Sequence, residues 1–342
     1  MRCSVIILNW NGAAMLRQFL PSVIRYSSVA DCEIVVADNG SSDESLDVLA
    51  DYPTVRVVPF TQNYGFAEGY NRALAHTEAD YTILLNSDVE VAEGWLEAIL
   101  DYMDAHPDVV ACQPKILSYL SKKAYDEGRL EAIEFEHAGA AGGLMDVLGY
   151  PFCRGRILSY VEKDKGQYDN VASVFWASGA CLCIRTEVYK KEGGLDGRFF
   201  AHMEEIDLCW RLQCRGYNIV CVPSSVVYHL GGGSLNYENP RKTYLNFRNN
   251  LLMLYKNLPA KRLWWVWIIR FFMDYAAAMQ FVVAGQLENF RAVIKARMDF
   301  WKQCSLYQED RNINCHKAIR PVPATIARRS IVFDYYFLRR RK

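Results

Sequence analysis

Short apolar runs alternate with segments of helical periodicity along the first hundred residues. Apolar runs at 4–8 and 33–37 each lead into a polar loop and then into a helical pattern. Further strands are expected at 55–58 and 81–85, with a helix at about 66–76 between them. Continuous apolar strands that alternate with helices predict an α/β fold with a mostly parallel, doubly wound sheet, in which ligands bind beyond the carboxyl ends of the strands.

The pattern loosens between 109 and 170, where several glycines and mixed charges indicate loops or a short hairpin layer. A helix is expected at 204–215, followed by short strands at 219–222 and 226–228. Pro259 is expected to break the chain before a helical, tryptophan-rich tail.

Composition and charge narrow the class of protein. The 342 residues are 51% hydrophobic and 23% charged, which is typical of a globular chain. From Arg241 onward there are 20 Lys and Arg against 6 Asp and Glu, whereas the preceding part has 19 against 33. Because the basic residues are mixed with Trp, Phe and Leu, this tail indicates a membrane surface and not a nucleic acid.

The cysteines and the N-terminus point to an intracellular protein. The 11 cysteines are odd in number and have no Cys-x-x-Cys pair, so we expect reduced thiols that pack in the core. The apolar run at 4–8 is too short for a signal peptide and is interpreted as a strand.

Asn86-Ser87-Asp88 follows the apolar strand at 81–85. Oxygen ligands suit Mg²⁺ or Mn²⁺, which keep open positions for substrate phosphates. An Asx turn that simply ends the strand is the alternative. We expect Asp88 to bind the metal.

Asp38 ends the second strand, in the sequence Asp38-Asn39-Gly40-Ser41-Ser42-Asp43. Its carboxylate can accept hydrogen bonds from a base or ribose, whereas Asp43 is expected to cap a helix. No Gly-x-Gly-x-x-Gly follows the early strands, so a metal is expected to neutralise the pyrophosphate. The stretch from Asn63 to Arg72 can bind a nucleotide or sugar, or simply form a turn and helix cap.

Three acids lie at the start of the helix expected at 204–215, namely Glu204, Glu205 and Asp207. Acids in a first turn also offset the helix dipole, but three exceed that need. Transfer to a hydroxyl needs a general base, and we expect it to be Glu205. His229 ends an apolar strand before the glycine loop that starts at Leu230, and taken alone a packed histidine is the more common role.

These motifs together resemble the family 2 inverting glycosyltransferases of the GT-A fold, particularly the rhamnosyltransferase-like branch. The resemblance spans residues 3 to 250. Its markers are the motifs that begin at Val5, Asp38, Asn63, Asn86 and Gly193, the last of which leads into Glu204-Glu205-Ile206-Asp207.

The resemblance implies a role for each matching residue. Glu205 would be the catalytic base, and Asp88 with His229 would bind Mn²⁺ or Mg²⁺. The residues implied on the donor side are Asn9, Asn11, Asp38, Asn63, Gly65, Asn71 and Asn86. Those implied on the acceptor side are Trp176, Ser178, Gly179, Glu204, Asp207 and Arg211. Asn86 and Glu205 stand where the family often has Asp.

We therefore expect a GT-A domain at 1–240, with a nucleotide half at about 1–110 and an acceptor half at about 111–240, and a helical, basic region at 241–342. The expected activity is inverting transfer from a UDP- or dTDP-sugar, dTDP-rhamnose among them, to a glycan or lipid-linked acceptor in cell-surface polysaccharide synthesis. A catalytically silent nucleotide-sugar binding protein is the alternative.

The helical region at 241–342 determines where in the cell we expect the protein. Its apolar segment at 263–285 is interrupted by Arg270 and Asp274, and a charge in the centre of a spanning helix costs about 2.5 to 3.5 kcal/mol. We expect an amphipathic helix in the membrane interface, with Lys261, Arg262 and the terminal run 339–342 on anionic lipid, which places the protein on the inner face of the cytoplasmic membrane. A packed appendage or a homodimer contact is the alternative.

Overall fold

The computed structural model describes residues 1–29, 31–231 and 239–340. The strands are β1 (Cys3–Asn9), β2 (Cys32–Asp38), β3 (Arg56–Pro59), β4 (Tyr81–Asn86), β5 (Val89–Val91), β6 (Val109–Ser118), β7 (Gly143–Met145), β8 (Pro151–Cys153), β9 (Arg156–Ile157), β10 (Tyr160–Val161), β11 (Ala172–Ser173), β12 (Cys181–Arg185) and β13 (Asn218–His229). The helices are α1 (Ala13–Tyr26), α2 (Ser45–Ala50), α3 (Gly65–Leu74), α4 (Trp95–Ala105), α5 (Tyr119–Asp126), α6 (Thr186–Lys191), α7 (Glu204–Cys214), α8 (Pro240–Asn257), α9 (Ala260–Val283), α10 (Leu287–Gln303), α11 (Gln308–Lys317) and α12 (Ile331–Tyr336), with 3₁₀ turns η1 (Gly197–Phe199) and η2 (Cys304–Tyr307).

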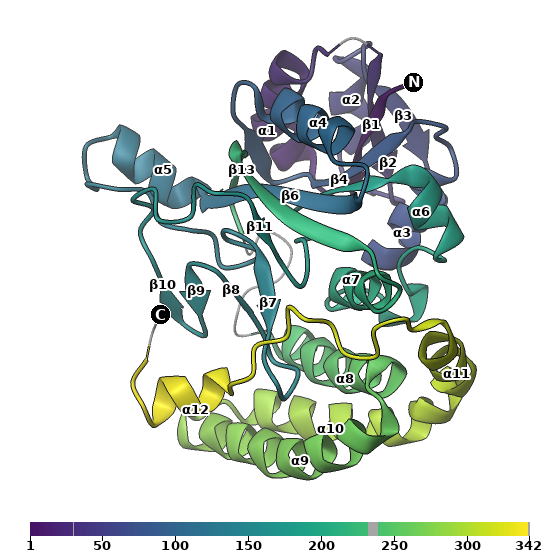
Figure 1. Cartoon of the computed structure of the whole chain (residues 1–342). Coiled ribbons are helices and arrows are strands. Elements are labelled where there is room, and N and C mark those ends of the chain that lie inside the picture. Colours follow the sequence, from purple (N-terminus) through teal and green to yellow (C-terminus); the bar gives the residue numbers. More distant parts are fainter. Residues whose placement is uncertain (30, 232–238, 341–342) are drawn as a thin grey trace.

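A mixed, mostly parallel sheet forms the centre of the molecule (Figure 1). Within the described residues it has nine strands in the order β11-β13-β6-β12-β4-β1-β2-β3, with β5 paired to β13. The pairs β4-β1, β1-β2, β2-β3 and β6-β13 are parallel, whereas β12 runs antiparallel to both of its neighbours. The predicted α/β fold with a mostly parallel sheet is confirmed.

The side chains of β1 show why the sheet is covered on both faces. Val5 and Ile7 pack with α1, α2 and α4, whereas Ile6 packs on the opposite face with α3 and α7. All three side chains are buried. A strand buried on both faces needs a continuous apolar run, which is why this pattern was readable in the sequence.

The sequence pattern missed one of the central strands. Residues 109–118 form β6, which is buried along nearly its whole length, where loops or a hairpin layer were expected. Gln113, Pro114 and Lys115 hide it in the sequence by interrupting the apolar run. Only Ala111 and Cys112 of β6 pair with β12, so the edge of the strand facing away from β13 is free at Pro114, where a missing N–H group is tolerated.

A second correction concerns the end of the sheet. The two short strands expected at 219–222 and 226–228 are one strand, β13, whose register shifts between Val222 and Val226. The expected hairpin layer does exist, as a small sheet in the order β10-β9-β8-β7 that lies beside the main sheet (Figure 1).

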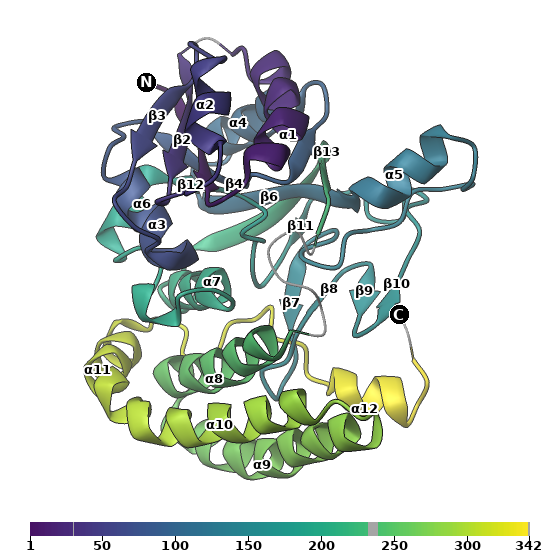
Figure 2. The same cartoon turned by 180° about the vertical axis from the view of Figure 1, so that it is seen from behind.

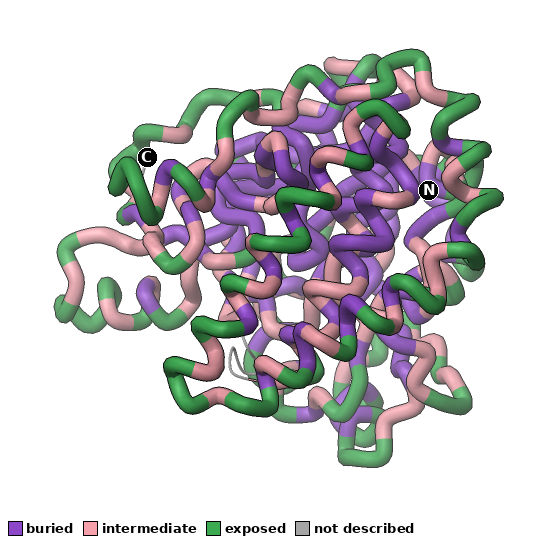
Figure 3. Tube along the Cα trace, turned by 90° about the horizontal axis from the view of Figure 1, so that it is seen from below, coloured by how far each residue is buried: buried purple, intermediate pink, exposed green. Residues whose placement is uncertain are grey.

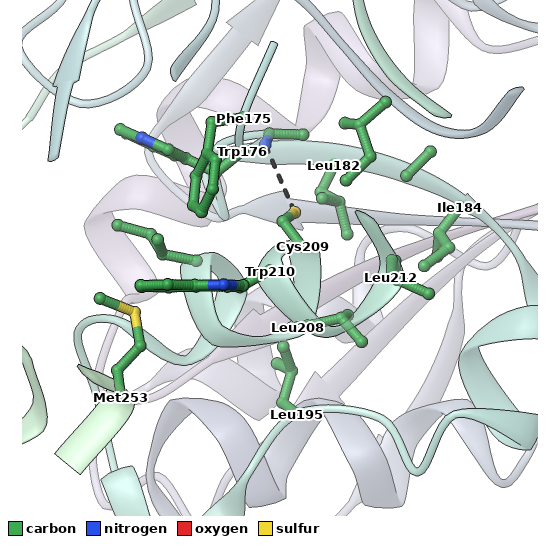
Figure 4. Packing of buried hydrophobic residues seen from close by; sticks show 14 of the residues in the cluster. Phe175, Trp176, Leu182, Ile184, Leu195, Leu208, Cys209, Trp210, Leu212 and Met253 are labelled. Carbon is green, nitrogen blue, oxygen red and sulfur yellow. Dashed lines mark hydrogen bonds between the residues drawn. The ribbon is translucent and has the colours of Figure 1, made fainter. Parts of the chain in front are cut away.

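The C-terminal helices pack against the sheet domain through α7 and α8, as the view from behind also shows (Figure 2). Leu251, Leu252 and Leu254 of α8 belong to the same buried cluster as Phe175 and the α7 residue Trp210. Figure 4 shows this packing around α7, where the thiol of Cys209 accepts a hydrogen bond from the Ala177 N–H group at 3.5 Å. The core therefore runs without interruption from the sheet into the helical region.

Candidate active site

The parallel register brings three predicted residues to one edge of the sheet. Asn9 pairs with Asp38, and Leu8 pairs with Asn86, so the strand ends lie side by side. The Asn9 amide donates to the Asp38 carboxylate at 3.0 Å, and Asp38 is only 2% exposed. Oδ1 of Asn9 is buried and has no hydrogen-bond partner within the described residues.

Asn11 and Asp43 organise the two loops at this edge. Asn11 has φ 49° and its side-chain oxygen accepts from the Ser42 N–H group at 2.7 Å. The Asp43 carboxylate accepts from the N–H groups of Ala13 and Ser45, at the starts of α1 and α2. Asp43 thus binds the first N–H group of α2, but the N-cap position that we expected it to hold belongs to the next residue, Glu44.

The predicted residues Asn63, Gly65 and Asn71 lie around α3. Asn63 accepts from the Gly65 N–H group at 2.7 Å, and Asn71 binds the backbone of Leu195 through both its amide nitrogen and its oxygen. Gly65 has φ +80°, and a Cβ there would lie 2.6 Å from the ring of Phe200. Gly65 and Asn71 thus connect α3 with the segment before α7, whereas Asn63 joins the start of α3 to Asn39 after β2.

Asp88 and His229 face each other beyond β4 and β13. Nε2 of His229 lies 3.1 Å from the Asp88 carboxylate and 3.4 Å from the Asn86 amide nitrogen. Nδ1 of the same ring lies 3.8 Å from the Glu136 carboxylate, which is an ion-pair distance and too long for a hydrogen bond. Glu136 was missed by the sequence reasoning, because it lies in the stretch after β6 that showed no periodicity.

The charges of His229, Asp88 and Glu136 depend on one another. Burial alone would lower the pKa of His229, but the carboxylates of Asp88 and Glu136 outweigh burial and raise that pKa to about 10. Burial likewise opposes ionisation of Asp88, but the imidazolium outweighs it and lowers the pKa of the carboxyl. The negative charge of Asp88 therefore favours a positive charge at this position, and the His229 imidazolium supplies it.

A divalent cation fits this donor set. A carboxylate oxygen and an imidazole nitrogen, both beside a buried strand end, are ligands that Mn²⁺ accepts. The described residues contain no group of three His, Cys, Asp or Glu side chains that could hold a metal ion. Such an ion would therefore depend on phosphate oxygens of a substrate for part of its coordination.

Glu205 lies at the same edge of the sheet. The Asn86 N–H group at the end of β4 donates to the carbonyl of Ala180 at 3.0 Å, which places Gly179 beside that strand end. A Cβ on Gly179 would lie 3.9 Å from the carboxyl carbon of Glu205 and 3.1 Å from the ring of Phe66. The structure thus brings Gly179 and Glu205 together, as the resemblance implied.

Burial dominates the two neighbouring carboxyls at the start of α7. It raises the pKa of Glu205, although backbone N–H groups, that of Gly179 among them, offset part of the rise. Burial and the charge of Glu205 raise the pKa of Glu204 well above its ordinary value. Oε2 of each residue lacks a hydrogen-bond partner within the described part of the chain. A carboxylate with a raised pKa and a free oxygen is suited to accept a proton.

A strained turn directly precedes Glu204 and Glu205 in the chain. Phe200, His202 and Met203 have φ values of 67°, 70° and 75°, a region that non-glycine residues rarely adopt. The side-chain amide of Asn249, on α8, donates to the carbonyls of Phe199, Ala201 and His202 at 2.8 to 3.0 Å. Asn249 was also missed by the sequence reasoning, because a polar residue inside a helix gives no sign of what it faces.

Asp207 and Arg211, which the resemblance put on the acceptor side, do not join Glu205. Asp207 is fully buried and binds Lys256 at 2.9 Å, Asn257 at 2.8 Å and Arg211 at 3.0 Å. Arg211 also donates to the carbonyl of Gly194 at 2.5 Å. This network joins α7 to α8.

Trp176 and Ser178 are buried as well. The Trp176 indole donates to the carbonyl of Leu144 at 2.9 Å and packs on Gly143, while the Ser178 hydroxyl donates to the carbonyl of Ala138 at 3.1 Å. Both hold the segment that leads to Gly179 against the small sheet. The glycine loop after Leu230 falls largely at 232–238, outside the described residues.

Comparison with known proteins agrees with this geometry. Residues 4–155 match the family model described as Glycosyl transferase family 2. An N-acetylglucosaminyl-diphospho-decaprenol L-rhamnosyltransferase of Mycobacterium tuberculosis is 28% identical over 237 residues, which cover 66% of this chain and 75% of that relative.

Solved structures show the same fold. GalNAc-T7, crystallised with UDP, GalNAc and Mn²⁺, matches with a TM-score of 0.57 and 17% identity, over 93% of this chain and 58% of that one. The mannosyltransferase PcManGT of Pyrobaculum calidifontis, in complex with GDP-Man and Mn²⁺, matches with a TM-score of 0.52 and 15% identity, over 92% of this chain and 84% of that one. Residues 4–155 therefore match the family 2 glycosyl transferases, and the chain has the GT-A fold.

Proposed function

We propose that the chain transfers a sugar from a nucleotide diphosphate donor to a hydroxyl of a glycan or lipid-linked acceptor, with inversion at the anomeric carbon. The observation that carries this is the placement of Glu205 beside Gly179, at the sheet edge where β1, β2 and β4 end. Nucleotides bind at that edge of open α/β sheets, so a general base located there, such as Glu205, reaches the reacting sugar.

The donor side is assigned to Asn9 and Asp38. Their hydrogen-bonded pair presents a buried carboxylate and an unpartnered amide oxygen, which match the N–H and O–H donors of a base and a ribose. Asn11 keeps the loop after β2 in position, Asn63 joins that loop to the start of α3, and Gly65 and Asn71 hold α3 against the segment before α7. We therefore infer direct donor contacts for Asn9 and Asp38 and a positioning role for the other four.

Asp88 and His229 are the residues that would hold Mn²⁺ or Mg²⁺, with Asn86 beside them. When bound, the ion offsets the negative charge that develops on the departing nucleotide diphosphate. Two structural neighbours were crystallised with Mn²⁺, which supports a divalent ion and leaves the choice between Mn²⁺ and Mg²⁺ to experiment.

Glu205 performs the proton transfer. Its carboxylate takes the proton of the acceptor hydroxyl as the hydroxyl oxygen bonds to the anomeric carbon, and the bond from that carbon to the diphosphate oxygen breaks. Attack from the face opposite the leaving group inverts the configuration.

The substrate class follows from the relatives. The Mycobacterium tuberculosis relative is named as an L-rhamnosyltransferase that acts on a diphospho-decaprenol acceptor, so we propose a lipid-linked or glycan acceptor in cell-surface polysaccharide synthesis. A UDP- or dTDP-sugar, dTDP-rhamnose among them, is the proposed donor, and the inner face of the cytoplasmic membrane is the proposed location.

The test is donor turnover across UDP-, GDP- and dTDP-sugars with Mn²⁺ or Mg²⁺ and a lipid-linked acceptor. We expect one donor to react, Glu205→Gln to abolish transfer while donor binding persists, and Asp88→Ala to weaken donor binding. Glu97→Gln, an exposed position on α4, makes the same chemical change away from the site and is the matched control. Binding of a donor without any transfer, unchanged by Glu205→Gln, would favour a silent binding protein instead.

A further inference from the structure

The helix α9 has two opposite faces. It is the one helix in the described part of the chain that is long and apolar enough to cross a membrane by length and composition. Its inner face is a stripe of buried residues at four-residue spacing, namely Val266, Arg270, Asp274 and Ala278. The two charges that interrupt its apolar sequence therefore point into the protein.

A buried ionic cluster fixes that inner face. Asp274 binds Arg270 at 3.1 Å and Arg297 of α10 at 2.6 Å. Arg270 also donates to the side-chain oxygen of Asn250 at 2.6 Å and lies over the ring of Tyr150. Moving α9 across a bilayer would break this cluster and place its charges in hydrocarbon, so the helix stays on the protein.

The outer face of α9 is apolar and exposed. Its exposed large side chains are Trp264, Ile268, Ile269, Phe271, Phe272, Met279 and Val283. Trp264 is 62% and Phe272 is 67% exposed, and between Arg262 and Val283 only the two buried residues carry a charge. Figures 1 and 2 both place α9 at the outer edge of the molecule, and Figure 3 views the molecule from that side.

The patch continues onto α10. Trp301, which is exposed, lies edge-to-face against Trp267 of α9 with ring centroids 5.4 Å apart. A helix of 24 residues is about 36 Å long. An apolar surface of that length is larger than a soluble monomer normally leaves uncovered.

Charge identifies the partner. Exposed cations flank this surface at Lys261, at the start of α9, and at Lys302, the residue after Trp301 on α10. Residues 241–342 carry 20 Lys and Arg against 6 Asp and Glu. We propose that the outer face of α9 together with Trp301, which we name the α9 face, docks on the surface of an anionic lipid bilayer and lies in its interface without crossing it.

A second copy of the chain fits this surface less well. A two-fold contact through the α9 face would bring the same basic residues of both copies together, and like charges repel. A bilayer that contains anionic lipid offers the opposite charge and accepts aromatic side chains at headgroup depth. The proposal deepens the proposed function, because a lipid-linked acceptor would be reached from this position.

The experiment is sedimentation of the full chain with vesicles of phosphatidylcholine, with and without phosphatidylglycerol. We expect binding to the anionic vesicles that weakens as salt is raised. Phe272→Glu should reduce the partition coefficient by about 10-fold or more, because burying a Phe side chain contributes at least the free energy of a factor of ten. Leu120→Glu, an equally exposed residue on α5, is the matched control and should bind as the native chain does.

Two further measurements separate this proposal from the proposed function. Glu205→Gln should sediment with vesicles like the native chain, and Phe272→Glu should keep its transfer rate with a soluble acceptor. Equal vesicle binding by the native chain and Phe272→Glu, or absence of binding, would overturn the proposal. So would a dimer in sedimentation velocity that Phe272→Glu dissociates, because the α9 face would then belong to a second copy.

Discussion

The replacement Asn249→Asp tests how the base is positioned. Aspartate has the same shape but lacks the amide N–H groups that bind the carbonyls of Phe199, Ala201 and His202. The oxygen that accepts from Arg248 is retained. The change therefore removes the donors that hold the turn before Glu205 and sets a carboxylate oxygen against the same carbonyls, with Arg248 beside the new charge.

The magnitude follows from the backbone of the turn. Two N–H bonds at a net value of about 1 kcal/mol each represent about 2 kcal/mol of lost stabilisation. Backbone with positive φ costs about 1 to 3 kcal/mol for each non-glycine residue, hence about 3 to 9 kcal/mol for Phe200, His202 and Met203 together. Because the bonds from the amide offset part of this strain, we expect the turn to relax once the amide is gone and to carry Glu205 with it.

A displacement of about 1 Å at a reacting group lowers a rate by about 100-fold. We therefore expect kcat to fall by about 100-fold, the donor KM to change by less than about 3-fold, and Tm to fall by about 3 to 5 °C. Initial rates at saturating donor and differential scanning fluorimetry measure these quantities.

Asn250→Asp is the matched control for this prediction. Asn250 is the next residue of α8 and equally buried, but its amide binds the carbonyl of Gly149, and its oxygen accepts from Arg270, away from the turn. The reasoning is refuted if Asn249→Asp keeps the native kcat, or if both variants lose kcat and Tm to the same extent.

Three further predictions concern charge. Transfer needs ionised Glu205, and burial raises the pKa of this carboxyl. We therefore expect kcat to fall at low pH with an apparent pKa above the ordinary glutamate value of about 4.3. An apparent pKa below that value would contradict this. Chelation with EDTA should abolish transfer and added Mn²⁺ should restore it, whereas Asp88→Ala should bind Mn²⁺ more weakly in calorimetry; full activity in EDTA would contradict the metal site. Lys256→Met should lower the free energy of unfolding in urea by about 1.5 to 3 kcal/mol, because it removes the buried cation that Asp196 and Asp207 share while Arg198 and Arg211 still pair with them, and a loss below about 1 kcal/mol would contradict this.

Much of the nucleotide half was predictable. The strands β1, β2 and β4 are buried on both faces, so their apolar runs stood out, and the polar residues that end them had to meet at one sheet edge. Asn9, Asp38 and Asn86 lie there for that reason. Three acids at a helix start singled out the beginning of α7, and the choice of Glu205 among them as the base stays a prediction.

The parts that were missed depend on partners far away in the sequence. Lys115 obscured β6 because a buried lysine reads as exposed until Asp164 and Asp169 are seen beside it. Glu136 reaches His229 only because the stretch after β6 returns to the sheet edge. Arg270 and Asp274 interrupted an apolar helix in the sequence, and the structure turns both inward.

By itself, the sequence determined the α/β class and the sheet edge that carries the polar residues, because burial on both faces and strand polarity follow from local sequence patterns. Only the tertiary structure decided which polar residues serve the site and which serve packing. Asp207, Arg211 and Asn71 resemble their neighbours in the chain, yet their partners lie on α8, before α7 and after α6. A side chain's role depends on what it contacts, and contacts between distant segments are fixed only when the whole core has formed.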